Sequence, residues 1–500
     1  MTSSLEARLV ELEAASRPLD PDPAGRAALF GPVFDYAERF LDALPSLPAY
    51  VVTMDKGRGV LDLQFREDGR SIERVLSVLG DQVDRPGLNP ASGGHLGYIP
   101  GGGLYASALA DYLADITNRY PGVFFSSPGA TRVEHQVVRW TADMVGFPAG
   151  AGGTLASGGS IANLICLAAA RDAHGIRSRD VERVVVYLSS QTHHCITKNL
   201  RLLGLGECVL RYLPLDQRFR IRAEALASQI EADRRAGLSP WLLVASAGST
   251  DVGAIDPLDS LADLAAEHRL WYHVDAAYGG YFLLVPGMRE RFRGIERADS
   301  TVLDPHKTLF LPYGLGIALV RDQATLAQAF RSDAPYLQDT LTEREEDSPA
   351  DLSPELTRPF RGLRLWLPLL VHGLAPFRAS LEEKLLLTQW LHAELRTRGW
   401  EVGPEPDLSV ITYRWVPDGL DPELVNRLNA RVVELIKQDG RVYVSSTLIE
   451  GRYTIRYAGV THRTHLTTVR LLLDLLEGFA GQAQRELVAP GAGAGVRSTV

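Results

Sequence analysis

Between residues 130 and 330, short apolar runs rich in β-branched residues alternate with stretches of helical periodicity. Strands are predicted at residues 184–188, 209–213, 241–245, 270–274, 301–303 and 316–320, with helices between them that include 223–235 and 258–268. Strands that are apolar throughout and separated by helices are typical of a mostly parallel sheet covered on both faces. Ligands of such α/β sheets bind at the carboxyl ends of the strands. Any ligand site of this region is therefore expected where these runs end.

The pattern changes on both sides of this region. Leu5, Leu9 and Leu12 recur at helical spacing, which predicts an amphipathic arm that either folds back on its own domain or clasps a neighbouring subunit. Three apolar runs with helices between them predict a smaller α+β domain near the other end: 409–413, 441–444 and 453–457. The predicted organisation is an N-terminal helical arm (1–95), a large α/β domain (96–375), a small α+β domain (376–485) and a disordered tail (486–500). The acidic stretch 332–357 is expected to be a lid or a disordered loop.

Composition narrows the function classes. A net charge of −9 argues against a nucleic-acid surface, which needs clustered basic charge. No apolar run is long enough to cross a membrane, and the first residues carry no apolar segment typical of a secretory signal. Cys166, Cys195 and Cys208 are too widely spaced for a disulfide framework or a zinc site. We therefore expect no metal and a cytoplasmic location.

Two segments could hold a flat, phosphorylated ligand. Gly158-Gly159-Ser160 enters a predicted helix, where backbone N–H groups and a hydroxyl can bind a phosphate, although the serine could also be a simple helix cap. Asp275 lies at the end of a buried strand, where a carboxylate needs a cationic partner. That partner is either a structural salt bridge or a protonated pyridine nitrogen, for which the following alanines leave room.

Two further segments carry reactive side chains. His193 follows the strand at 184–188, where an imidazole can stack on a planar ligand or transfer a proton; a surface position, expected for His194, is the alternative. Lys307 ends the segment Asp304-Pro305-His306-Lys307 between apolar runs. Desolvation there favours a neutral amine that can condense with an aldehyde, whereas the alternative is a lysine whose stem lies along apolar surface. A phosphate cradle, a ring-nitrogen acid, a stacking imidazole and an aldehyde-trapping amine together describe pyridoxal 5′-phosphate.

With these segments, the chain resembles the group II pyridoxal-phosphate decarboxylases over nearly all of residues 50–485. These are relatives of the aromatic-amino-acid and glutamate decarboxylases, with the type I aminotransferase fold. The resemblance implies phosphate contacts from Gly159, Ser160 and Ser300. It implies that Asp275 contacts the pyridine nitrogen, that Ala277 lies beneath the ring and that His193 lies above it. Thr250 would lie near the ring substituents. His306 would contact the cofactor, and Lys307 would be the Schiff-base lysine. Arg456 would receive the substrate carboxylate, and Tyr98, Ile99, Phe310 and Tyr336 are candidate substrate-pocket residues.

The resemblance also implies the reaction: decarboxylation of an L-amino acid to an amine and carbon dioxide through an internal aldimine on Lys307. Residues 341–357 contain no tyrosine, the nearest being Tyr336, and the family's lid tyrosine protonates the quinonoid carbon. Decarboxylation-coupled oxidative deamination to an aldehyde is therefore an alternative. Two further alternatives are another pyridoxal-phosphate-dependent carbon–carbon lyase and a noncatalytic dimerising scaffold.

A homodimer with active sites at its interface is expected, with the glycine loop 97–103 as a cross-subunit wall or a plain linker. Asp304 has no assigned role, because an acid there would repel the phosphate unless it is protonated or turned away.

Overall fold

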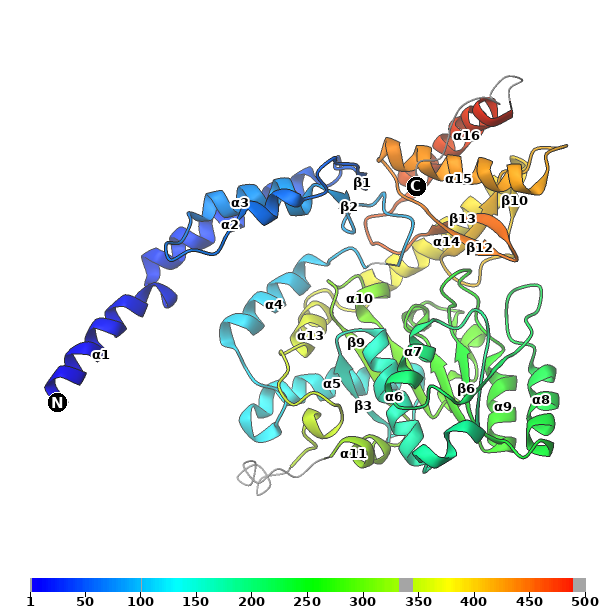
Figure 1. Cartoon of the computed structure of the whole chain (residues 1–500), viewed down its shortest axis with the longest axis horizontal. Coiled ribbons are helices and arrows are strands. Elements are labelled where there is room, and N and C mark those ends of the chain that lie inside the picture. Colours follow the sequence, from blue (N-terminus) through cyan, green and yellow to red (C-terminus); the bar gives the residue numbers. More distant parts are fainter. Residues whose placement is uncertain (1, 100, 332–344, 489–500) are drawn as a thin grey trace.

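The computed structural model describes residues 2–99, 101–331 and 345–488 (Figure 1). An N-terminal arm leads into a large α/β domain, and a smaller domain with its own sheet follows. Tyr336 and the predicted disordered tail from residue 489 onward lie outside the described residues. No helix among the described residues is both long and apolar enough to pass through a bilayer.

The arm consists of helices that project from the rest of the molecule and a two-stranded sheet that lies beside the small domain (Figure 1). Its elements are α1 (Thr2–Ser16), α2 (Pro23–Ala43), β1 (Tyr50–Val51), α3 (Ile72–Leu79) and β2 (Gly87–Leu88). A turn with prolines at positions 18, 21 and 23 follows α1. Asp22 caps the start of α2 by accepting a hydrogen bond from the Gly25 N–H. The leucines of the predicted amphipathic arm lie on a helix as expected, but they face solvent: Leu5 and Leu9 are 62% and 56% exposed.

The large domain is built on a seven-stranded sheet in the order β3-β9-β8-β7-β6-β4-β5. The strands are β3 (Gly152–Ala156), β4 (Val184–Leu188), β5 (Val209–Tyr212), β6 (Ser239–Ser246), β7 (Trp271–Asp275), β8 (Ser300–Leu303) and β9 (Gly316–Val320). β9 alone runs opposite to the other six strands, so the predicted mostly parallel sheet is confirmed. The strand that the sequence did not reveal is β3, whose two glycines hide its β pattern.

Helices cover both faces of this sheet (Figure 1). They are α4 (Tyr105–Thr117), α5 (Pro128–Val145), α6 (Gly159–Ala173), α7 (Cys195–Leu202), α8 (Ala223–Arg235), α9 (Leu258–His268), α10 (Pro305–Thr308), α11 (Ala324–Phe330) and α13 (Gly362–His372). Alternate residues of β6 serve the two faces: Leu242 packs with α7, and Leu243 packs with α8 and α9. Burial on both faces explains why the strands read as continuous apolar runs.

The small domain carries an antiparallel sheet in the order β10-β11-β13-β12. Its elements are α14 (Ala375–Thr397), β10 (Glu401–Val402), β11 (Val410–Arg414), α15 (Pro422–Asp439), β12 (Ser445–Ile449), β13 (Arg452–Ala458) and α16 (Leu466–Val488). The strand predicted at 441–444 is wrong, because the sheet strand begins at Ser445. The extended backbone at Tyr443 instead bonds to the segment just before the glycine loop: its N–H donates to the Gly94 carbonyl, and its carbonyl accepts from the Leu96 N–H.

Candidate active site

A cavity of about 360 Å³ lies where β3, β4, β6, β7 and β8 end. Its lining is Ser157, Gly158, Gly159, Ser160, Ile161, Asn163, Gln191, His193, Cys195, Ser246, Gly248, Ser249, Thr250, Asp275, Ala277, Tyr278, Asp304, His306 and Lys307. All four segments that the sequence singled out therefore meet in one place, as expected at the carboxyl ends of parallel strands.

The turn between β3 and α6 forms one wall of the cavity. Gly158 has φ of +154°, and a Cβ there would lie 3.0 Å from the His306 ring. A Cβ on Gly159 would lie 2.7 Å from Asp304 Oδ2, so this turn has no room for larger residues. The 15-residue helix α6 begins at Gly159 and directs its N-terminal amides at the cavity, with Ser160 beside them. This arrangement fits a phosphate group.

Asp275 ends β7 and is 9% exposed. Its carboxylate accepts hydrogen bonds from the Ala277 N–H at 3.1 Å and from Asn163 Nδ2 at 3.3 Å. Within the described ranges, Asp275 has no salt bridge to a lysine, arginine or histidine. A buried carboxylate that faces a cavity without a cationic partner fits the protonated ring nitrogen of pyridoxal phosphate.

His193 lies in the loop after β4, half-buried, with its Nδ1 accepting a hydrogen bond from the Cys195 N–H. Burial lowers the pKa of His193, and the nearby Asp275 charge opposes this shift only in part. The imidazole is therefore neutral at physiological pH. A neutral ring at the cavity wall can stack on a planar cofactor and exchange a proton.

Lys307 differs from the expectation of a desolvated, neutral amine. Its Nζ lies 3.0 Å from Asp304 Oδ2, and Asp304 is 1% exposed. Burial alone would lower the pKa of Lys307, but the charges of Asp304 and Asp275 outweigh it and leave the pKa above its usual value. In the cofactor-free protein the lysine is thus an ammonium ion paired with Asp304, one helical turn upstream in sequence.

The raised pKa gives a testable pH dependence. An ammonium ion must lose its proton before it can attack an aldehyde, so cofactor capture is expected to accelerate as pH rises toward the pKa of Lys307. Asp304→Asn removes the main charge that raises this pKa and is expected to move the midpoint of the rate profile to lower pH by about one unit. Stopped-flow absorbance between pH 8 and 11.5 measures the midpoint, which in the wild type lies above the ordinary lysine value of 10.5, and an unmoved midpoint would contradict the pairing. The ion pair stabilises the folded protein fully at pH values below the pKa of lysine in the unfolded chain. This stabilisation is lost as the pH rises through the higher pKa of Lys307 in the folded protein.

Of the predicted cofactor residues, His306 lines the cavity and Ser300 does not. The Nδ1 of His306 lies 2.6 Å from the Leu315 carbonyl oxygen, and its ring lies against Gly158. Ser300 is fully buried inside the sheet and does not line the cavity. Its hydroxyl contacts Trp271 and His273 instead of the phosphate cradle.

Arg456 on β13 is 5% exposed and lies beside the cavity rather than in its wall. Its guanidinium donates to the carbonyls of Gly97, Thr250 and Asp251 at 2.7, 2.7 and 3.0 Å, and to Ser445 Oγ at 3.0 Å. Four of its five N–H groups are therefore engaged within the protein. The arginine joins the small domain to the glycine loop and to the Thr250 turn.

Three predicted substrate-pocket residues lie outside the cavity lining. Tyr98 is 51% exposed and its hydroxyl meets that of Tyr443 at 3.2 Å. Ile99 is partly buried against the large core, and Phe310 is buried beside Phe377. Only Tyr98, on the glycine loop next to the Arg456 contact, has the exposure to meet a substrate or a second chain.

Sequence reasoning missed several residues of the cavity. Asn163 follows Gly159 by one helical turn on α6, so helical periodicity could have placed it next to the phosphate turn. Cys195 and Tyr278 lie two and three residues after His193 and Asp275, so their nearness in sequence could have included them, whereas Ser246 at the end of β6 carries no such signal. Among the described residues, no group of three or more His, Cys, Asp or Glu side chains could hold a metal ion.

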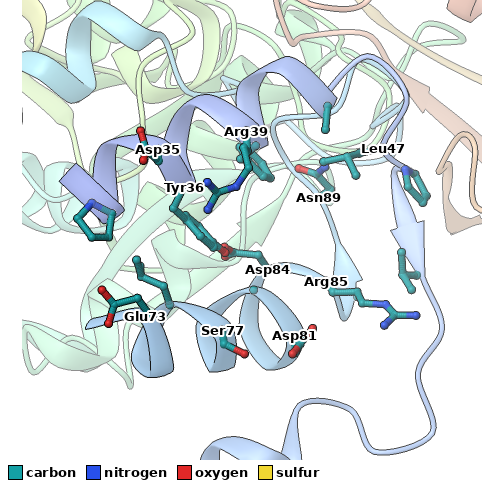
Figure 2. Close-up of a pocket in the computed structure, with 18 residues that line it drawn as sticks. Asp35, Tyr36, Arg39, Leu47, Glu73, Ser77, Asp81, Asp84, Arg85 and Asn89 are labelled. Carbon is teal, nitrogen blue, oxygen red and sulfur yellow. The ribbon is translucent and has the colours of Figure 1, made fainter. Parts of the chain in front are cut away.

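A second cavity, of about 980 Å³, lies in the arm between α2 and α3 (Figure 2). Tyr36 points across it and donates a hydrogen bond to Asp84. None of the residues that we predict to contact the cofactor lines this cavity. It is therefore a feature of the arm and not of the catalytic centre.

Comparison with known proteins agrees with this geometry. Residues 85–416 match the family model described as the pyridoxal-dependent decarboxylase conserved domain. The chain is 34% identical to an aromatic-L-amino-acid decarboxylase of Bacillus atrophaeus, over 84% of this chain and 87% of that protein. It is 29% identical to a phenylacetaldehyde synthase of Petunia hybrida, over 77% and 80% of the two chains. The fold matches the crystal structure of Oryza sativa TDC with PLP and tryptamine at a TM-score of 0.87 and 24% identity, covering 93% of this chain and 99% of that one.

The match to the family model spans more than half of the chain, and the cavity has the anion-binding turn, the unpaired acid and the lysine that pyridoxal phosphate requires. The protein is a pyridoxal-phosphate-dependent enzyme that decarboxylates an L-amino acid. The chain belongs to the pyridoxal-dependent decarboxylase family.

Proposed function

We propose that the protein converts an aromatic L-amino acid to its amine and carbon dioxide, with pyridoxal phosphate held covalently by Lys307. The observation that carries the site assignment is the meeting of Lys307, Asp275 and the Gly159 turn in one cavity. The aromatic preference is supported by the Bacillus atrophaeus relative, whose name gives aromatic amino acids as its substrates.

Each wall of the cavity has a separate task in this proposal. The amides at the start of α6 and the Ser160 hydroxyl bind the phosphate. Asp275 holds a proton on the pyridine nitrogen, and Ala277 leaves room beneath the ring. When bound, the cofactor supplies an electron-accepting ring for the carbon–carbon bond that breaks as carbon dioxide leaves.

Three further residues are proposed to act on the substrate side. The neutral His193 imidazole stacks against the ring and carries a proton at Nε2, because its Nδ1 already accepts the Cys195 N–H. Thr250 lines the cavity next to the ring substituents. Arg456 keeps one N–H free of the bonds described above, and it is the proposed contact for the substrate carboxylate.

The test is a product assay with the twenty amino acids. We expect phenylalanine, tyrosine or tryptophan to give equal amounts of carbon dioxide and amine, and glutamate to give none. The same reaction monitored for oxygen uptake separates a second candidate, oxidative deamination to an aldehyde with release of hydrogen peroxide. That candidate is favoured by the tyrosine-free stretch 341–357 and by the similarity to the Petunia hybrida phenylacetaldehyde synthase. Unchanged amine formation under strictly anaerobic conditions, without peroxide in air, would exclude it.

A homodimer in the cytoplasm is part of the proposal. The arm leaves leucine and phenylalanine side chains exposed to solvent, including Leu5, Leu9, Phe30 and Phe34. An apolar surface of this kind is typical of a subunit interface. Light scattering should give the mass of two chains, and removal of residues 1–43 should give the mass of one shortened chain.

A further inference from the structure

A chain of hydrogen bonds runs through the sheet behind Asp275. Trp271 Nε1 donates to Ser300 Oγ at 2.8 Å, and Ser300 Oγ lies 2.8 Å from His273 Nδ1. His273 Nε2 lies 2.6 Å from Asn163 Oδ1, and Asn163 Nδ2 donates to Asp275 Oδ2 at 3.3 Å. The chain spans β8, β7 and α6, and Ser300, His273 and Asn163 are all at most 1% exposed.

The direction of every bond in this chain follows from its two ends. The Trp271 indole can only donate, so the Ser300 oxygen accepts there. At the other end the Asp275 carboxylate can only accept, so Asn163 donates through Nδ2 and turns its oxygen to His273 Nε2. A neutral imidazole that donates at Nε2 accepts at Nδ1, and the donor there is the Ser300 hydroxyl. Burial lowers the pKa of His273 to about 4, although the charge of Asp275 opposes the shift. The imidazole is therefore neutral with its proton on Nε2, which it donates to the Asn163 oxygen. The Asn163 amide nitrogen is left to face Asp275 and the Gly159 carbonyl, the latter at 2.9 Å.

We propose that Ser300 is a positioning residue that acts through His273 and Asn163 to hold Asp275 ready for the ring nitrogen of the cofactor. The proposal rests on the assignment of Asp275 to that nitrogen. Ser300 touches neither the cavity nor the phosphate turn, so its influence on the cofactor passes through the hydrogen-bond chain alone. Aligned hydrogen bonds in a buried site polarise one another, which strengthens the last bond to the carboxylate.

Loss of the Ser300 hydroxyl would reach Asp275 through the bonds that follow it in the chain. Without a donor at Nδ1, the His273 tautomer with its proton on Nε2 loses the bond that favours it. The bond from Nε2 to Asn163 Oδ1 is then less polarised, and so is the Asn163 N–H that faces Asp275 at 3.3 Å.

Several charged and titratable groups from different elements face Asp275. Variants are therefore compared at the same pH, so that these groups carry the same charge in each. The groups are Lys307 on α10 with Asp304 beside it, His193 in the loop after β4, and Cys195 on α7. Burial raises the pKa of Cys195 to about 12, so its thiol stays neutral. His193 and Lys307 have no direct hydrogen bond to Ser300, His273 or Asn163; Asn163 Nδ2 lies 3.6 Å from the Cys195 sulfur, and the Cys195 N–H in turn donates to His193.

The experiment compares Ser300→Ala with Thr301→Val in the full-length protein. Thr301 is the next residue on β8, is fully buried, and donates its hydroxyl to the Val274 carbonyl at 2.8 Å, outside the chain. Both variants lose one buried hydroxyl, so their unfolding midpoints report the shared structural cost. Ser300→Ala is expected to bind pyridoxal phosphate about tenfold more weakly, the effect of one hydrogen bond to a charged group. Thr301→Val is expected to bind it like the wild type.

A second readout is the ¹⁵N resonance of cofactor labelled at the ring nitrogen, followed against pH. In Ser300→Ala the ring nitrogen is expected to lose its proton at lower pH than in the wild type or in Thr301→Val. Asn163→Leu should shift it in the same direction, because leucine removes the N–H that faces Asp275 and adds no charge. Ser300→Ala and Thr301→Val with equal affinities and equal titrations would overturn the proposal. If Asp275 does not contact the ring nitrogen at all, Asp275→Asn would also leave the titration of that nitrogen unchanged. That result separates a wrong assignment of Asp275 from a wrong role for Ser300.

Discussion

Lys307→Ala is expected to abolish turnover and the visible absorbance of the covalently bound cofactor. The lysine is the one amine that lines the cavity, with Asp275 and the phosphate turn around it. A methyl group cannot condense with an aldehyde, and no neighbouring side chain of the cavity carries an amine to replace it. Borohydride treatment followed by peptide mass spectrometry should find the cofactor on Lys307 in the wild type and on no residue in the variant. Turnover by Lys307→Ala at the wild-type rate would refute the assignment.

Lys307→Arg is the matched control for this loss. The guanidinium keeps a positive charge near Asp304 but does not form the covalent link, so turnover should also vanish. The two variants should differ in stability when the cofactor is absent. Lys307→Ala leaves Asp304 buried without its cation, which costs about 3 kcal/mol. Denaturant unfolding should show Lys307→Arg closer to the wild type, and equal losses would mean that the ion pair contributes little.

The meeting of three of the four segments could be predicted from sequence because of the topology of a parallel sheet. His193, Asp275 and Lys307 each lie at the end of a predicted strand or shortly after one, and parallel strands place all of their carboxyl ends at one edge. These three residues therefore needed no knowledge of side-chain contacts to be grouped, whereas Gly159 was added because its turn has the residues of an anion site. The same logic could not find β3, where glycines replace the apolar pattern, or the role of the stretch around Tyr443, which bonds to the distant segment just before the glycine loop.

The electrostatics of the site depended on contacts that the sequence does not show. The apolar flanks of Lys307 predict a neutral amine, yet the ion pair with Asp304 keeps it charged. Asp304, which had no role in the sequence reading, is thus the partner of the lysine in the cofactor-free protein. Ser300 was expected at the phosphate, but the register of β7 and β8 pairs it with His273 instead. Register between strands far apart in sequence cannot be derived from either strand alone.

Asp275→Asn is expected to lower turnover by on the order of 10²–10³-fold, the usual cost of removing one preorganised electrostatic group from an active site. The amide has the shape of the carboxylate and can still accept the Ala277 N–H, so the fold should be retained. Without the negative charge, the pKa of the pyridine nitrogen falls by about one to three units. The ring then loses its proton more readily and withdraws electrons less strongly. Single-turnover kinetics with an aromatic amino acid measures the loss in the chemical step.

The control for Asp275→Asn is Asp233→Asn on α8. Asp233 is also a buried carboxylate, and it faces Arg211 at 2.7 Å and Tyr187 at 3.0 Å, away from the cavity. This variant should lose stability without losing turnover. The double variant Ser300→Ala/Asp275→Asn adds a stricter test, because Ser300 is proposed to act only through the carboxylate. Its turnover should equal that of Asp275→Asn alone. A further drop on adding Ser300→Ala would show that the serine reaches the cofactor by a route other than Asp275.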